Sequence, residues 1–267
     1  MTSREVLITG GSDGIGLAVA RLLAAEEGTR VTLVARDAAK LRNAVATLTG
    51  DGHDVIAADL SVPNDISTLA AHLASRHYDV LVNNAGFGLY GRFAELSLDD
   101  QLRMMRLNMD SVVVLSHAYL CQARRGDALV NTASFLGYAP MPGAAAYSAT
   151  KAFVAALSET LWWEYRHKGV YVVSFNPSVM ATRFHAAAGA SVAVFPRVFA
   201  QSPETVAREL VAALRRRTAP RVITGFATRQ FVRLQRVVSS KTALDMMGRN
   251  SPIADGSKTS EPTSHLG

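Results

Sequence analysis

The chain has 267 residues, of which 49% are hydrophobic, and a formal net charge of +6. This length is sufficient to bury a full core, and we expect one large α/β domain rather than two small ones. The single cysteine, Cys121, excludes an internal disulfide, and the first ten residues contain no long apolar stretch that could be a signal sequence. The longest nearly apolar run, 186–195, is about half of the roughly 20 residues that a membrane-spanning helix needs. We therefore expect a cytoplasmic protein without a membrane span.

Short β-branched runs alternate along the chain with alanine-rich or amphipathic segments. Near-continuous apolar strands joined by crossover helices indicate a parallel sheet with helices on both faces, which is a doubly wound, Rossmann-type α/β fold. In such a fold, ligands bind at the carboxyl ends of the strands. The expected strands are Val6–Thr9, Val31–Ala35, Val55–Ala58, Val80–Asn83, Leu129–Thr132, Val170–Phe175 and Arg221–Thr224.

The first expected strand leads into a glycine-rich turn, Thr9–Gly16. The missing side chains of Gly10, Gly14 and Gly16 let the backbone turn tightly and let a pyrophosphate approach the N-terminus of the next helix. The spacing, Thr-Gly-x3-Gly-x-Gly, differs from the usual Gly-x-Gly-x-x-Gly of dinucleotide-binding folds. We interpret this turn as the pyrophosphate-binding part of a dinucleotide site.

A second motif lies about halfway along the chain, where Tyr147 and Lys151 are four residues apart and follow Ser134. Four residues are roughly one helical turn, so the phenol and the ammonium group project from one face of a helix. A free phenol has a pKa near 10, and a nearby cation favours its deprotonated form. One group can therefore supply a proton while the other tunes its pKa.

These motifs, in this order, resemble those of the short-chain dehydrogenase/reductase family from about Glu5 to Thr182. The resemblance implies that Tyr147 donates a proton to a carbonyl oxygen as hydride arrives from a nicotinamide, and that Ser134 holds this oxygen. It also implies that Asn108 supports a proton relay through water. The cofactor residues expected on this basis are Gly10, Ser12, Gly14, Ile15, Gly16, Arg36, Asp59, Leu60, Asn83, Ala85, Gly86, Tyr147, Lys151, Met180 and Thr182.

The resemblance also bears on the choice between NADP(H) and NAD(H). Arg36 ends the second expected strand, where an arginine pairs with the 2′-phosphate of NADP and a carboxylate would bind the ribose of NAD. Asp13 in the glycine turn is a counter-signal, although similar enzymes of the long-chain 3-oxoacyl reductase type combine such an aspartate with such an arginine. Asp59 matches the family's adenine contact. We expect NADP(H), with NAD(H) as the alternative.

The match weakens at Asn176–Thr182, where Ser178 and Met180 replace the family's usual glycine and β-branched residue. A serine adopts positive φ less readily than glycine, so the geometry of this loop is expected to differ. The residues that follow, about 183–203, lie where the family places its substrate lid and carry little charge. We expect an apolar pocket for an extended acyl chain, a steroid-like ring system or a polyketide ketone.

The leading hypothesis is an NADPH-dependent oxidoreductase that reduces a ketone of a hydrophobic substrate. The alternatives are a family member that uses bound NADP(H) for epimerisation or elimination without net redox change, and a cofactor-binding regulatory scaffold. A metal site is not expected, because His117, His167 and His185 have no ligand spacing around them.

The C-terminal part is basic, with ten Lys/Arg against three Asp/Glu in residues 201–250. We expect a catalytic domain over 1–225, one basic amphipathic helix over 226–250, and a disordered tail over 251–267. On this helix the expected polar face carries Arg229 and its neighbours, and the expected packed face includes Leu234. A solvated face, or weak contact with a membrane surface or a carrier protein, explains the charge; nucleic acid is not expected. A homo-oligomer is expected by default.

Overall fold

The computed structural model describes residues 4–179, 197–249 and 251–253. In these ranges seven parallel strands form one sheet with the order β3-β2-β1-β4-β5-β6-β7. The strands are β1 Arg4–Thr9, β2 Thr29–Ala35, β3 Asp54–Ala57, β4 Val80–Asn83, β5 Ala128–Thr132, β6 Tyr171–Asn176 and β7 Arg221–Ile223. The doubly wound, Rossmann-type sheet predicted from the sequence is confirmed, and the expected strands differ from the observed ones by at most two residues at either end.

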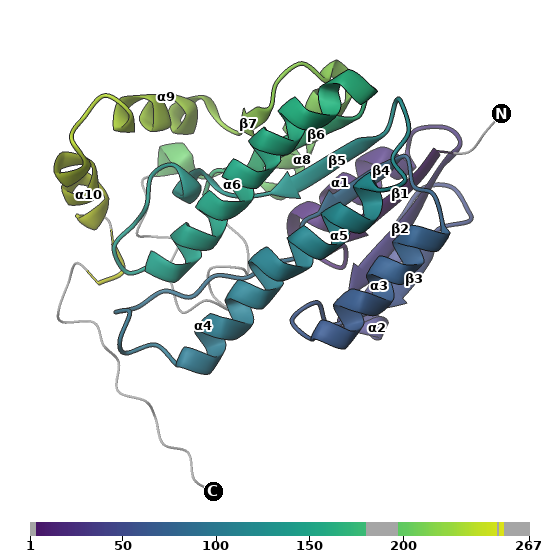
Figure 1. Ribbon diagram of the computed structural model, residues 1–267, viewed down its shortest axis with the longest axis horizontal. Coiled ribbons are helices and arrows are strands. Elements are labelled where there is room, and N and C mark those ends of the chain that lie inside the picture. Colours follow the sequence, from purple (N-terminus) through teal and green to yellow (C-terminus); the bar gives the residue numbers. More distant parts are fainter. Residues whose placement is uncertain (1–3, 180–196, 250, 254–267) are drawn as a thin grey trace, which may run out of the picture.

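The helices cover both faces of the sheet. They are α1 Gly14–Ala24, α2 Ala38–Val45, α3 Pro63–Ser75, α4 Leu98–Met105, α5 Ser111–Leu120, α6 Ala145–Tyr165, α8 Pro203–Arg216, α9 Phe226–Gln235 and α10 Ser240–Gly248. One core cluster joins β1 to α1, α2 and α8, and another joins it to α3, α5 and α6, which lie in front of the sheet in Figure 1. Successive β1 residues serve opposite faces: Val6 and Ile8 enter the first cluster and Leu7 the second.

The chain order reverses between β1 and β4, which are neighbours in the sheet. The strands β2 and β3 lie on one side of this pair, and β5, β6 and β7 lie on the other. In open α/β sheets the loops diverge at such a point and leave a crevice at the carboxyl ends of the strands. The glycine turn follows β1 and the Asn84–Gly86 segment follows β4, so both border this crevice.

The expected single helix over 226–250 is wrong, because the structure has two helices, α9 and α10. The break falls at 236–239, and Ser239 caps α10 by accepting a hydrogen bond from the Thr242 backbone N–H at 3.2 Å. The packed face of α9 also differs from the expectation. Val232 is buried, whereas Leu234 is 46% exposed.

Residues 251–253 are bonded to one another and to the domain, which corrects the expected start of the disordered tail at residue 251. Ser251 is buried, and its hydroxyl donates to the Pro142 carbonyl at 2.6 Å. The Ile253 backbone N–H donates to the Ser251 hydroxyl at 3.1 Å. Residues 254–267 lie outside the described ranges.

Two further features bear on the expectations from composition. No helix within the described ranges is long and apolar enough to cross a bilayer. The thiol of Cys121 is exposed just beyond α5, 3.8 Å from the ring nitrogens of His117.

Candidate active site

The glycine turn between β1 and α1 has the close backbone approaches that its sequence predicts. Gly10 and Gly14 have φ values of +64° and +56°, which favour glycine. A Cβ added at Gly16 would lie 2.3 Å from the Gly10 carbonyl oxygen, so no side chain fits there. The Asp13 side chain caps α1 by accepting from the Gly14 backbone N–H at 2.7 Å. The turn therefore leaves the N-terminus of α1 free of side-chain bulk at Gly14, as an approaching pyrophosphate requires.

Hydrogen bonds fasten this turn to the loop after β4. The Thr9 hydroxyl accepts from the backbone N–H groups of Asn84 and Ala85 at 2.9 and 3.0 Å. The Asn84 side-chain amide donates to the carbonyls of Thr9 and Gly10 at 3.1 and 3.3 Å. These four bonds fix the two loops across the crevice, so both walls keep one spacing.

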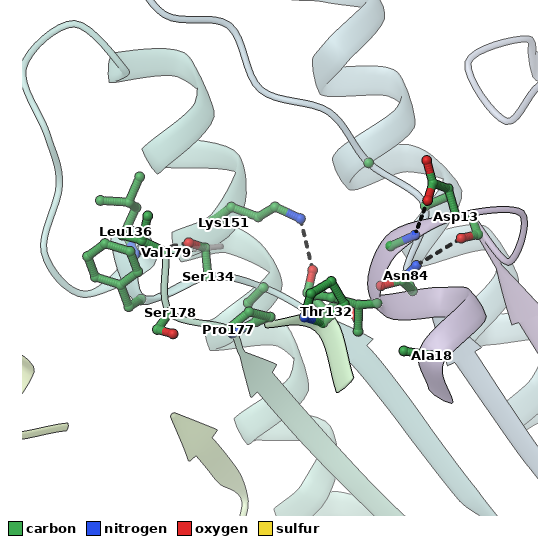
Figure 2. A pocket seen from close by; sticks show the side chains of 18 of the residues that line it. Asp13, Ala18, Asn84, Thr132, Ser134, Leu136, Lys151, Pro177, Ser178 and Val179 are labelled. Carbon is green, nitrogen blue, oxygen red and sulfur yellow. Dashed lines mark hydrogen bonds between the residues drawn. The ribbon is translucent and has the colours of Figure 1, made fainter. Parts of the chain in front are cut away.

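A pocket of about 530 Å³ fills this crevice. It runs from the N-terminus of α1 to the start of α6, and Figure 2 shows Asp13 and Asn84 on one side and Ser134, Leu136 and Lys151 on the other. Of the expected site residues it brings together Gly10, Gly14, Ile15, Ala85, Gly86, Ser134, Tyr147 and Lys151.

Arg36 and Asp59 lie together outside this pocket, just beyond β2 and β3. Their side chains form an ion pair with 3.9 Å between Nη1 and Oδ2, and the Arg36 side chain is 67% exposed. Burial raises the pKa of Asp59, but hydrogen bonds from Ser61 and the charge of Arg36 outweigh it, so this pKa lies below its ordinary value. Asp59 is therefore a carboxylate at neutral pH, paired with a largely exposed guanidinium.

Not every expected cofactor residue presents its side chain to the pocket. The Asn83 side chain turns into the interior, where its amide donates to Asn131 Oδ1 at 2.9 Å and to the Ser116 hydroxyl at 3.2 Å. Leu60 is buried, and Ser12 does not line the pocket. Met180 and Thr182 lie outside the described residues.

Ser134, Tyr147 and Lys151 meet at the floor of the pocket. All three are at least 92% buried, since their exposed fractions are 8%, 6% and 5%. Ser134 follows β5, whereas the other two lie in the first two turns of α6. The hydroxyls of Ser134 and Tyr147 share a hydrogen bond, and the Lys151 ammonium lies 5.8 Å from the centre of the Tyr147 ring. The three residue types that the sequence singled out thus converge on one point.

Burial dominates the proton chemistry of this group. It raises the pKa of Tyr147 well above the ordinary value, although the hydrogen bond with Ser134 acts in the opposite direction. Burial also lowers the pKa of Lys151 to about 8. The Lys151 ammonium donates to the Thr132 carbonyl at 2.9 Å (Figure 2). Tyr147 is therefore a neutral phenol that can donate a proton, and the expected lowering of its pKa by Lys151 is not seen.

Asn108 lies in a π-helical segment, Arg106–Asp110, between α4 and α5. The Asn108 side-chain oxygen accepts from the Phe87 backbone N–H at 3.2 Å. Its side-chain amide nitrogen donates to the Phe87 carbonyl at 2.9 Å and to the Thr150 hydroxyl at 3.2 Å. A Cβ at Gly86 would lie 2.9 Å from Asn108 Oδ1 and 3.4 Å from Lys151 Nζ. Single π-turns recur at functional sites, and this one places Asn108 close to Lys151.

Two pocket residues were not found from the sequence. Tyr90 is buried, lines the pocket and packs against Tyr147 with 5.9 Å between ring centres. Burial, followed by the proximity of Tyr147, raises the pKa of Tyr90 far above its ordinary value. The carbonyl of Thr132 receives the Lys151 bond. A tyrosine in a loop and a backbone carbonyl carry no sequence signal of such a role.

One group of metal-ligand types occurs within the described ranges, although no metal site was expected. His77, Asp79 and Asp127 converge where β4 and β5 begin, at the edge of the sheet opposite the pocket. Asp79 accepts from the Glu5 backbone N–H at 2.7 Å, and Asp127 accepts from the Arg124 backbone N–H at 2.6 Å and lies 3.0 Å from the His77 ring. These hydrogen bonds give the three side chains a structural role, which is to hold together the loops that precede β4 and β5.

The profile of the short chain dehydrogenase family matches residues 4–193, which is well over half of the chain. The chain belongs to the short-chain dehydrogenase/reductase family. This membership accounts for the sheet, the glycine turn and the Ser134–Tyr147–Lys151 group together, and it makes the protein an oxidoreductase that binds a nicotinamide cofactor.

Known members of this family align with most of the chain. One relative is a Streptomyces violaceoruber protein named as ketoacyl reductase 1 of the granaticin polyketide synthase. It is 35% identical to this chain over 184 residues, which are 66% of this chain and 67% of that protein. A short-chain dehydrogenase from Sphingobium yanoikuyae, solved in complex with NADPH, is 29% identical, with a TM-score of 0.76 over 91% of this chain and 99% of that one. The bulky-bulky ketone specific alcohol dehydrogenase from Comamonas testosteroni is 26% identical, with a TM-score of 0.74 over 89% and 95% of the two chains.

Proposed function

We propose that this short-chain dehydrogenase reduces a ketone of a hydrophobic substrate to the alcohol and uses NADPH to do so. The observation that carries the proposal is the buried Ser134–Tyr147–Lys151 group at the floor of a pocket whose other end is the N-terminus of α1. The glycine contacts fit a dinucleotide, because the missing Cβ of Gly16 lets α1 pack against the Gly10 carbonyl, and Gly86 lines the pocket without a side chain. When bound, the reduced nicotinamide supplies a hydride.

The protein side of this reaction is proton transfer and charge stabilisation. The Ser134 hydroxyl, which already hydrogen-bonds Tyr147, holds the substrate oxygen beside the phenol. The raised pKa keeps Tyr147 protonated at neutral pH, so its O–H bond can break and the proton can pass to the oxygen that becomes the alcohol. The nearby charge of Lys151 stabilises the phenolate that remains until a proton returns from solvent. Asn108, fixed by its bonds to Phe87, orders water on that return path.

Arg36 supports NADPH over NADH as the partner in this reaction. Its guanidinium is largely exposed just beyond β2, and its nearest carboxylate, that of Asp59, is still 3.9 Å away. It is free to form charge-assisted bonds with a 2′-phosphate. Asp13 remains a counter-signal, because its carboxylate, which accepts from the Gly14 N–H, lines the same pocket. The NADPH bound to the Sphingobium yanoikuyae protein agrees with this choice.

The wall of the pocket supports a hydrophobic substrate. Around the catalytic group the lining is mostly apolar, with Tyr90, Phe135, Leu136, Pro177 and Val179. Such a surface favours acyl, polyketide or steroid-like ketones, since a sugar would leave its hydroxyls without partners. The names of the relatives from Streptomyces violaceoruber and Comamonas testosteroni, a ketoacyl reductase and a bulky ketone alcohol dehydrogenase, point to the same class.

The test is a fluorescence titration of the purified protein with NADPH and NADH, followed by NADPH consumption with a panel of hydrophobic ketones. We expect tighter binding of NADPH than of NADH, and loss of this preference in Arg36→Asp. Exposed Arg42 on α2 offers a matched control, and Arg42→Asp should keep the preference. Turnover without net NADPH oxidation would favour the epimerase or lyase alternative. Binding of NADPH without turnover of any substrate would favour the cofactor-binding scaffold, and binding of neither nucleotide would contradict the proposal.

We also propose a homo-oligomer that pairs through α4, α5 and α6. Large apolar side chains are exposed on these helices without a partner element of the described chain over them, which suits a protein interface better than water. Size-exclusion chromatography with light scattering should give at least twice the monomer mass, and a monomer at micromolar concentration would refute the proposal. The exposed side chains are Leu98, Leu102, Met105, Val113, Val114, Phe153 and Trp163.

Other expectations stay predictions: the cytoplasmic location, the extent of the catalytic domain over 1–225, and weak contact of the basic C-terminal part with a membrane surface or a carrier protein. Arginines of α8, β7 and α9 line a cavity of about 490 Å³ in which Glu209 is the one acidic lining residue of the described chain, and this surplus of positive charge supports an anionic partner. Binding to anionic vesicles and not to neutral ones would identify a membrane surface as that partner.

A further inference from the structure

Ser178, where the sequence departs from the family, lies in the wall of the active-site pocket (Figure 2). Arg217 is the one non-glycine residue with positive φ in the described ranges, so Ser178 fits without the backbone strain that the sequence suggested. Its backbone N–H donates to the Thr224 hydroxyl at 2.9 Å. Its side-chain hydroxyl donates to Gln201 Oε1 at 2.6 Å. The replacement of glycine therefore adds a hydrogen bond at the pocket wall.

Gln201 uses all of its side-chain polar groups and its backbone N–H in this region. Its backbone N–H donates to the Val179 carbonyl at 3.0 Å. Its side-chain oxygen receives the Ser178 bond, and its amide nitrogen donates to Glu209 Oε1 at 3.0 Å. Gln201 thus bonds Ser178 and Val179 of the pocket wall and connects them to Glu209 of α8.

Glu209 carries the chain of contacts onward to the C-terminal helix α9. Its Oε1 also accepts from the Gly225 backbone N–H at 3.0 Å, and its Oε2 receives the Arg229 guanidinium at 3.0 Å. Arg229 in turn donates to the Ile223 carbonyl of β7 at 3.1 Å. Bonds to ionised groups are stronger than those between neutral groups, and a connected line of them holds one geometry. The line Ser178–Gln201–Glu209–Arg229 therefore joins the pocket wall to α9.

The opposite side of the same wall is bonded to the catalytic segment. The Phe135 backbone N–H, next to Ser134, donates to the Pro177 carbonyl at 3.3 Å. Residues 177–179 are thus bonded to Phe135, Thr224 and Gln201. A substitution of the Gln201 side chain would remove its bond to Ser178 while leaving the side chains of Ser134, Tyr147 and Lys151 in place.

We propose that Gln201 is a positioning residue that fixes the Pro177–Val179 wall at the nicotinamide end of the pocket and makes its position depend on Glu209 and Arg229. This inference rests on the proposed function, since it assigns the wall a part in holding the cofactor. It predicts that side chains on α8 and α9, outside the catalytic group, set the affinity for NADPH.

The decisive comparison is Gln201→Leu against Gln230→Leu. Gln201→Leu removes both side-chain hydrogen bonds of Gln201 and keeps a similar side-chain volume. Gln230→Leu is the control, because Gln230 is exposed on α9. Within the described chain, the one side-chain hydrogen bond of Gln230 is that from Arg233, at 3.3 Å. We expect Gln201→Leu to weaken NADPH binding in a fluorescence titration about tenfold and to raise KM for NADPH similarly, with kcat changed less than threefold. Gln230→Leu should match the wild type.

Two further variants separate positioning from stability. Ser178→Ala should weaken NADPH binding about threefold, and adding it to Gln201→Leu should have no extra effect, because both remove the same bond. Gln201→Glu places a carboxylate against Glu209 and should weaken binding more than Gln201→Leu does. The second change Glu209→Gln should recover part of that loss, since it restores a donor opposite the new carboxylate.

The outcomes are distinguishable. Unchanged NADPH affinity in Gln201→Leu and Ser178→Ala, with or without a lower Tm, would overturn the proposal and leave the network a purely structural one. Additive effects of the two substitutions would also overturn it. Failure of the wild-type protein to bind NADPH would instead contradict the proposed function, and this inference would fall with it.

Discussion

The two ends of the active-site pocket are built in different ways. At the α1 end, glycines bring backbones so close that no Cβ fits at Gly16, and the Thr9 hydroxyl and the Asn84 side-chain amide bond backbone groups across the two loops. At the β6 end, the wall is held by the side chains of Ser178, Gln201 and Glu209. At the first end only glycine fits, because any side chain would collide with the backbone. At the second end, several different combinations of polar side chains could form an equivalent set of hydrogen bonds. The first end should therefore tolerate almost no substitution, and the second should respond in proportion to the bonds removed.

The largest expected effect is at the Ser134–Tyr147–Lys151 group on the pocket floor. Tyr147→Phe removes the proposed proton donor and should lower kcat about 10²–10⁴-fold. Its ring keeps the packing against Tyr90, so NADPH affinity should stay within about twofold of the wild type by fluorescence titration. Residual turnover near the wild-type rate would show that another group supplies the proton. Tyr165→Phe at the end of α6 is the matched control.

The next largest effect tests the α1 end. Gly16→Ala forces a methyl group against the Gly10 carbonyl, and overpacking of this kind costs about 1–3 kcal/mol. We expect NADPH binding at least tenfold weaker and a lower free energy of unfolding in a denaturant titration. Gly248→Ala on α10 is the control, because its nearest contact would be Pro142 at 3.7 Å. Equal effects of both substitutions would contradict the contrast between the two ends.

A third prediction concerns pH and Lys151. Burial lowers its pKa to about 8 from the ordinary 10.5, so between these values the unfolded chain binds more protons and the stability contributed by this group rises with pH. Below pH 8 both states carry the proton and the folded state pays the burial cost. The stability of Lys151→Met relative to wild type should therefore be highest at pH 7 and fall by about 3 kcal/mol towards pH 10.5.

Urea unfolding of the wild type and Lys151→Met at pH 7, 8 and 9 measures this difference. Tyr147 does not disturb the comparison, because its pKa is raised and its effect on stability, a loss as pH rises, begins above pH 10 in both proteins. A difference that does not change with pH would mean that Lys151 keeps its ordinary pKa in the folded chain.

The smallest effect is expected at the C-terminal edge. Ser251→Ala removes the hydroxyl that bonds the Pro142 carbonyl and the Ile253 N–H, and one such bond is worth about 0.5–1.5 kcal/mol. Thermal unfolding should shift by a few degrees, with NADPH affinity unchanged. A change in cofactor affinity would show that the C-terminal attachment also reaches the pocket.

The sequence predicted the fold and the first end of the pocket because both follow from local rules. Apolar runs separated by amphipathic segments predicted the parallel sheet, and Gly10, Gly14 and Gly16 marked the turn where only glycine fits. The convergence of Ser134 with Tyr147 followed from the family resemblance, since no local rule relates β5 to α6. The exposure of Leu234 could not be predicted, because the helical pattern alone does not say which apolar side packs.

The second end of the pocket was beyond the sequence for a related reason. Gln201 joins Ser178 to Glu209 across 23 and 8 residues of chain, and nothing in their types or spacing marks them as partners. Ser178 itself was noticed, but as a departure that would disturb the loop. Its effect depends on whether a hydrogen-bond partner faces it in space, and that information exists only once β6, β7 and α8 are packed.

The exposed thiol of Cys121 has a practical consequence for these experiments. It is the single cysteine of the chain and lies just beyond the C-terminus of α5, towards the edge of the sheet where β5 begins and away from the pocket. A maleimide dye would therefore attach at one defined position without touching the catalytic group. A second dye at a cysteine introduced in place of exposed Val237 would give one interdye distance per molecule, from which single-molecule fluorescence could read how the C-terminal helices move when a nucleotide is added.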